Sequence, residues 1–191
     1  MKTVSMSGSL RENVGKKDAK KNRAEGKVPC VLYGGKSEVH FAANVKDFGP
    51  VIFTPYSHVI NLTVDGKSYQ TILQDVQYHP VTDEILHVDF LELQPGKPVI
   101  VSLPIRIEGV SVGVLRGGKL VKKFRKLKVK ALPEHLPEEI KLNISNLDIN
   151  DSIKVSDVTL DNVIFLDAPS GLVVSVISTR AVEETPVPGK K

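Results

Sequence analysis

Apolar and polar residues alternate along much of this chain, and alternation with a period of two is typical of β-strands that bury one face. In the first half of the chain the pattern predicts strands at residues 4–10, 28–33 and 85–93 and a hairpin over residues 59–74. The hairpin turns at Asp65-Gly66, a pair that readily adopts the positive φ angles of a type I′ turn.

Two short helices interrupt this pattern. The first is predicted over residues 19–25, where Asp18 suits the N-cap and Gly26 suits the C-terminal stop. The second is predicted over residues 45–52, because apolar residues recur there with helical spacing before Pro55. Short strands with one or two helices favour a small sheet that is closed or nearly closed.

The second half of the chain is more uniformly β. Alternation predicts strands at residues 99–107, 127–131, 140–144, 153–155 and 172–178. Pro104 has no backbone N–H to give to a sheet, so its strand is expected at a sheet edge or at a bulge. The whole chain is therefore expected to be mainly β.

A composition change divides the chain into two parts. Residues 94–98, Gln-Pro-Gly-Lys-Pro, mark the expected boundary between a domain at 1–94 and a second, mostly β domain at 95–182. Eight of the ten aromatic residues precede this boundary, so the halves are not copies of one repeat and are expected to have separate cores. Residues 183–191 are expected to form a flexible tail.

Charge is distributed unevenly along the 191 residues, although the net charge is only +4. The net charge is +6 over residues 1–36, −6 over 37–94, +8 over 116–130 and −4 over the remainder. Clustered bases neutralise phosphates, so the two basic segments are the candidates for contact with nucleic acid. An ordinary solvated surface is the alternative reading of both segments.

Several other kinds of site lack their signatures. The longest apolar runs fall far short of the roughly 20 residues of a membrane span, and the start of the sequence has no signal-peptide pattern, so cytoplasmic residence is expected. The lone Cys30 excludes an intramolecular disulfide and is expected to be a buried structural thiol. Gly-Lys-Ser occurs at residues 35–37 and 66–68 without the first glycine of a phosphate-binding loop. No cofactor and no small-molecule substrate are expected.

One set of residues has metal-binding chemistry. His87 and Asp89 share one face of the strand at 85–93, and His79 lies nearby in the sequence. A metal-dependent hydrolase that uses these three residues is the alternative function, although no ligand set of defined spacing accompanies them.

The first basic segment places Lys16, Lys20 and Arg23 at spacings of four and three, which puts them on one stripe of a helix. The second basic segment is a candidate further surface for nucleic acid or for an acidic neighbour, and it comprises Arg116, Lys119, Lys122, Lys123, Arg125, Lys126, Lys128 and Lys130.

Six motifs in the first half resemble, in order and spacing, the family of the bacterial large-subunit ribosomal protein twenty-five. They are Arg-Glu-Asn-Val-Gly-Lys at 11–16, the basic run to Arg23, Pro-Cys-Val-Leu-Tyr-Gly-Gly at 29–35, Val-Asp-Gly-Lys at 64–67, Gln-Asp-Val-Gln-Tyr-His-Pro at 74–80 and His-Val-Asp-Phe at 87–90. The second half is similar to the extra domain of the long form, the general stress protein CTC type, at residues 117–120, 132–137 and 144–147.

The resemblance implies a non-enzymatic protein of the large ribosomal subunit. Its first domain would be a six-stranded β-barrel that binds the loop E region of 5S ribosomal RNA in the central protuberance, next to other ribosomal RNA and proteins. The second domain would be a mostly β accessory module. Carried over position by position, the RNA-facing residues would be Arg11, Lys16, Lys20, Arg23, Tyr33, Gln77, His87 and Asp89.

Asp89 needs a specific role among these RNA-facing residues, and four other positions depart from the family pattern. A carboxylate that faces RNA accepts a hydrogen bond from a base amino group or orients a basic neighbour such as His87. Lys17, Ala19 and Asn22 stand where the family has a small residue, Ser and Leu, and Tyr78 stands where a basic residue is frequent.

Overall fold

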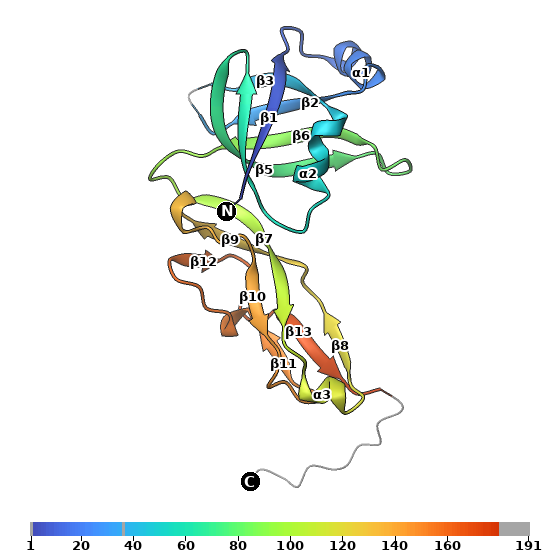
Figure 1. The fold of residues 1–191 in the computed structure, drawn as a ribbon, viewed down its shortest axis with the longest axis vertical. Coiled ribbons are helices and arrows are strands. Elements are labelled where there is room, and N and C mark those ends of the chain that lie inside the picture. Colours follow the sequence, from blue (N-terminus) through green and yellow to red (C-terminus); the bar gives the residue numbers. More distant parts are fainter. Residues whose placement is uncertain (1, 36, 180–191) are drawn as a thin grey trace.

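The computed structural model describes residues 2–35 and 37–179, so the tail expected at 183–191 lies outside the described residues. The chain forms two β-rich parts that follow one another along the long axis of the molecule (Figure 1). A closed barrel precedes the proline-rich segment at 94–98, and a second set of sheets follows it. The mainly β fold class is confirmed.

The first part is a closed six-stranded barrel in the order β1-β3-β2-β6-β5-β4. Parallel pairing between β1 and β4 and between β2 and β6 supplements the antiparallel hairpins. The strands are β1 (Thr3–Leu10), β2 (Lys27–Tyr33), β3 (Val39–Asn44), β4 (Val59–Val64), β5 (Lys67–Tyr78) and β6 (Ile85–Glu92).

Every second side chain of the strands points into the barrel and fills its core. In β6, Val88 and Phe90 are fully buried, whereas His87 and Asp89 point outward. The Phe90 ring packs on Phe41, with ring centroids 5.6 Å apart. This core fixes which face of β6 is available to a partner.

The β4–β5 hairpin turns as predicted. Asp65 and Gly66 have φ angles of 49° and 76°, as a type I′ turn requires. The predicted helix at 45–52 is also present, as a 3₁₀ turn, η1 (Val45–Phe48), that runs into α2 (Gly49–Ile52).

The first helix begins earlier than predicted. It is α1 (Lys16–Ala24), its N-cap residue is Gly15, and Asp18 lies inside its first turn. The predicted N-cap role of Asp18 is therefore wrong, because its carboxylate accepts hydrogen bonds from Arg11 instead of capping backbone N–H groups. Gly26 has a φ of 74° just beyond the helix, as expected for its end.

The second part contains a four-stranded sheet and a three-stranded sheet, in the orders β10-β7-β9-β12 and β11-β13-β8. The larger sheet consists of β7 (Val99–Glu108), β9 (Lys126–Ala131), β10 (Ile140–Asn143) and β12 (Val163–Phe165). The smaller sheet consists of β8 (Lys119–Lys122), β11 (Ser152–Lys154) and β13 (Leu172–Ile177). Short helical turns are α3 (Val112–Leu115), η2 (Pro133–His135) and η3 (Val155–Asp157).

Pro104 does not lie on an edge strand, because β7 has β10 on one side and β9 on the other. The pairing nevertheless changes at this residue. Residues 99–104 of β7 pair with β9, whereas pairing with β10 runs from Ile105 to Glu108. Pro104 therefore lies where the neighbouring strand on the β10 side has not yet begun, so its missing N–H costs the sheet no bond there.

The two parts contact one another through apolar side chains as well as being joined by the chain. The described residues form one core cluster inside the barrel and another in the second part. Ile72 of β5 belongs to the second cluster, although its partner in register, Leu91, is on the outer side of the barrel wall. The second part covers Ile72, which is only 2% exposed, so the two cores meet at the barrel wall.

Candidate nucleic-acid interface

The outer side of three adjacent strands gathers four of the residues that the sequence singled out. Because β6 lies between β2 and β5, Gln77 pairs in register with His87, and Tyr33 lies on the strand beside Leu91. We define the barrel face as the outward side chains Tyr33, Asp75, Gln77, His87 and Asp89. These side chains come from three sequence segments and form one surface.

Asp89 orients His87 within the barrel face. The Nδ1 atom of His87 lies 2.7 Å from Oδ1 of Asp89, and both side chains are partly exposed. Since a carboxylate accepts, Nδ1 is the donor of this bond and Nε2 is left for another partner. Of the two roles expected for Asp89, the structure therefore shows the orientation of its basic neighbour.

Asp75 belongs to this surface, although sequence reasoning did not select it. It stands opposite Asp89 in the β5–β6 register, and two carboxylates in such positions repel one another. Burial raises the pKa of Tyr33 above its ordinary value, and the charges of Asp89 and Asp75 raise it further. The Tyr33 phenol therefore stays protonated and able to donate. Asp75 could have been selected from the sequence, because it lies two residues before Gln77 and residues two apart on a strand share one face.

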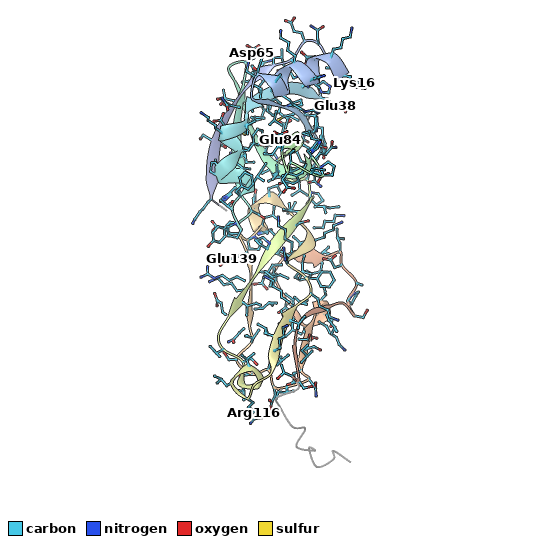
Figure 2. The ribbon with its side chains drawn as sticks, turned by 90° about the vertical axis from the view of Figure 1, so that its right-hand side faces the viewer. Lys16, Glu38, Asp65, Glu84, Arg116 and Glu139 are labelled. Atoms are coloured by element: carbon cyan, nitrogen blue, oxygen red, sulfur yellow. The ribbon has the colours of Figure 1, made fainter. Side chains whose placement is uncertain are left out.

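Helix α1 adds exposed bases beside the barrel face. Lys16 and Lys20 are exposed, and Figure 2 places Lys16 at the end of the molecule formed by the barrel. Arg23 donates from Nε and Nη2 to the carbonyl oxygen of Leu86, over 3.0 and 2.9 Å, so the helix is tied to β6 next to His87. The stripe predicted on this helix is present.

Arg11 is turned toward the protein. Its Nε and Nη2 atoms donate to Oδ2 of Asp18 over 2.8 and 2.6 Å, and its side chain is 7% exposed. Asn22, one of the departures from the family pattern, donates to the same carboxylate oxygen over 3.0 Å. Asp18 thus links the end of β1 to helix α1, and the guanidinium of Arg11 faces this carboxylate.

The second basic segment is divided among different environments. Arg116 forms an ion pair with Asp148, and Lys122 donates to the carbonyl oxygen of Ile105. Burial lowers the pKa of Lys122 below its ordinary value, and nearby Arg125 lowers it further. Lys119 and Lys123 are exposed on or next to β8, whereas exposed lysines alternate along β9. Of these residues, Arg116 and Lys122 therefore have partners within the protein.

The residues proposed for a metal do not assemble into a site. Nδ1 of His79 accepts hydrogen bonds from the backbone N–H groups of Val81 and Thr82, which shapes its own loop. No group of three or more His, Cys, Asp or Glu side chains that could hold a metal occurs within residues 2–35 and 37–179. Within the same described ranges, none of the helices is long and apolar enough to cross a membrane.

Comparisons with known proteins agree with this architecture. A model of the Ribosomal L25p family matches residues 6–90, and one of the ribosomal protein TL5 C-terminal domain matches residues 98–180. The large ribosomal subunit protein bL25 of Azobacteroides pseudotrichonymphae is 41% identical over 186 residues, 97% of this chain and 98% of that protein. Its namesake in Cytophaga hutchinsonii is 42% identical over 184 residues, 96% of each chain.

These similarities show that the chain is a structural, non-enzymatic protein of the large ribosomal subunit. It belongs to the ribosomal L25p family, in the long form with a second domain of the TL5 type. RNA binding, a role in translation and a place on the ribosome in the bacterial cytoplasm follow from this membership. The alternative of a metal-dependent hydrolase is thereby excluded.

Proposed function

We propose that the chain binds the loop E region of 5S ribosomal RNA, in the central protuberance of the large subunit, through the barrel face and helix α1. The observation that carries this proposal is that Tyr33, Gln77 and His87, from three different strands, converge on one outward surface beside a basic helix. Hydroxyl, amide and imidazole groups match the sugars and base edges of an RNA minor groove.

The charges of the barrel face and of helix α1 suit different parts of the RNA. The carboxylates of Asp75 and Asp89 repel phosphates, so the centre of the barrel face suits base edges and sugars. Lys16, Lys20 and Arg23 on α1 lie to the side of this centre, where they meet the sugar-phosphate backbone. Arg11 supports the interface indirectly, because its guanidinium holds Asp18 at the start of the helix.

The domain limits that we propose follow the same division. Residues 1–94 form the domain that binds 5S RNA, and residues 95–182 form the accessory domain. Support comes from the closed barrel before the proline-rich segment and from the separate sheets after it. The contact of Ile72 with the second core indicates that binding should be measured on the full chain.

Three substitutions in the full chain test the division between base readout and backbone contact. His87→Ala and Asp89→Ala should each weaken binding to 5S RNA at least about fivefold, since each loses or misorients a donor, and should weaken binding to an unrelated RNA duplex less. Lys20→Ala should weaken both RNAs alike. Dissociation constants at one fixed salt concentration provide the measurement.

His135→Ala is the matched control, because His135 is exposed in the second part, on the short turn η2. It should leave both dissociation constants unchanged. Equal effects of the His87, Asp89 and Lys20 substitutions on the two RNAs would refute the base-readout role of the barrel face.

A further inference from the structure

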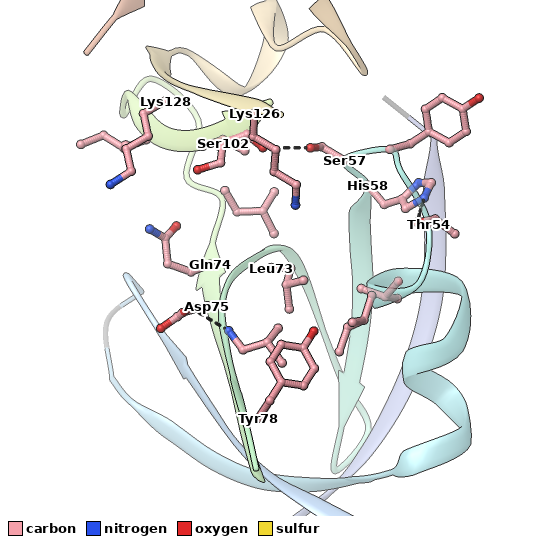
Figure 3. Close-up of a pocket in the computed structure, with 17 residues that line it drawn as sticks. Thr54, Ser57, His58, Leu73, Gln74, Asp75, Tyr78, Ser102, Lys126 and Lys128 are labelled. Carbon is pink, nitrogen blue, oxygen red and sulfur yellow. Dashed lines mark hydrogen bonds between the residues drawn. The ribbon is translucent and has the colours of Figure 1, made fainter. Parts of the chain in front are cut away.

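A groove of about 650 Å³ separates the barrel from the second part of the chain. Figure 3 shows Lys126 and Lys128 of β9 on one wall, with Gln74 and Tyr78 of β5 across from them. At one end the hydroxyl of Ser57 donates to the carbonyl oxygen of Ser102 over 3.4 Å, a bond that links the two walls. The groove therefore has walls from both parts of the chain.

The lysines of this groove are available to an anion. In β9, Leu127 and Val129 are fully buried, so Lys126 and Lys128 project outward about 6.7 Å apart along the strand. Neither ammonium group forms an ion pair with any residue in the described ranges 2–35 and 37–179. Asp167 is nearby, but its carboxylate accepts from the backbone N–H of Lys128.

The opposite wall offers groups that suit a nucleic-acid strand. Tyr78 is 44% exposed and contributes an aromatic ring, and Gln74 contributes a side-chain amide to the same wall. His58 also lines the groove: its Nε2 atom lies 3.0 Å from Oγ1 of Thr54, while its buried Nδ1 has no hydrogen-bond partner in the part of the chain that the structure describes. Asp75 contributes one carboxylate, which accepts from the N–H of Val76.

The groove adjoins the barrel face, because Asp75 belongs to both, but Tyr33, Gln77, His87 and Asp89 do not line the groove. Gln77 pairs in register with outward His87, whereas Tyr78 pairs with Ile85, which is buried. The register shifts between these two pairs, and Tyr78 lines the groove whereas Gln77 does not, so the two side chains present different surfaces of β5. Tyr78, Lys126 and Lys128 therefore lie in the groove and outside the barrel face.

We propose that the groove binds a strand of the long ribosomal RNA of the large subunit, separate from the RNA on the barrel face. Lys126 and Lys128 contact its phosphates, and Tyr78 stacks on a base. Free lysines combined with an exposed aromatic ring and amide are the features by which proteins hold single-stranded RNA. An acidic protein segment would use the lysines alone.

Tethered cleavage in assembled large subunits tests this proposal directly. Ile100 lines the groove and is 44% exposed, whereas the native Cys30 is fully buried, so an iron chelate attached to the full-length Ile100→Cys chain labels the groove selectively. Hydroxyl radicals released there should cut the long ribosomal RNA. The wild-type chain, treated in the same way, should give no cuts.

A pair of matched double variants shows whether the lysines hold that RNA. The double variant Lys126→Gln with Lys128→Gln should reduce the cleavage. For binding to subunits that lack the protein, the logarithm of the association constant should also depend less steeply on the logarithm of salt concentration, with a slope smaller in magnitude by about 1.4 to 1.8. Lys119→Gln with Lys123→Gln removes the same charge from exposed positions outside the groove and should change neither quantity.

Isolated 5S RNA separates this proposal from the preceding one. The Lys126 and Lys128 double variant should bind 5S RNA as the wild-type chain does, whereas the barrel-face variants should not. Cuts that are absent, confined to 5S RNA or found only in a neighbouring protein would overturn the groove proposal, as would equal behaviour of the two double variants. None of these results would alter the account of the barrel face.

Discussion

At the scale of single residues, two carboxylates act by holding a basic side chain. Asp89 fixes the ring of His87, and Asp18 receives the guanidinium of Arg11. The pair His87 and Asp89 could be expected from the sequence, because two residues on one strand face are neighbours. The pair Arg11 and Asp18 could not, since it depends on how the chain turns between β1 and α1.

Removal of Asp18 should expose the structural role of Arg11. Asp18→Ala leaves a guanidinium that is 7% exposed without its acceptor, so the free energy of unfolding should fall by about 1–3 kcal/mol. Glu12→Ala removes the same charge from an exposed neighbouring position and should have little effect. Urea unfolding of both variants provides the measurement, and equal stability would show that the pair contributes nothing.

At the scale of elements, most strands were predictable, including the short β10 and β11, whereas β3, β8 and β12 were not. The hairpin, β6 and β7 follow from period-two patterns of six or more residues. Strands β8 and β12 have the sequences Lys-Leu-Val-Lys and Val-Ile-Phe, in which apolar residues are adjacent and do not alternate. Helix α1 buries none of its residues, so no apolar stripe marks its start.

The β4–β5 hairpin, which carries Asp75 and Gln77, depends on its turn. Gly66 has a φ of 76° in open space, so Gly66→Ala should destabilise the protein by about 1–2 kcal/mol through backbone strain alone. Gly15 is also in open space but has an extended φ of 174° at the N-cap of α1, so Gly15→Ser should be neutral or slightly stabilising. Thermal unfolding compares the two, and an equal loss of stability would contradict this reading of the turn.

At the scale of the whole molecule, the fold determines where the two basic segments of the sequence lie on the surface. The first basic segment becomes an exposed helix beside the barrel face, and the second is split between β8, β9 and the ion pair of Arg116 with Asp148. Neither the cover over Ile72 nor the groove beside Lys126 could be predicted, because both arise where the two parts meet.

The measurement that tests the central claim most directly is the affinity of the full chain for 5S RNA as a function of salt. If Lys16, Lys20 and Arg23 neutralise three phosphates, the logarithm of the association constant should fall with the logarithm of salt concentration with a slope of about −2 to −3. Binding that does not change with salt, or no binding to 5S RNA, would contradict the proposed interface.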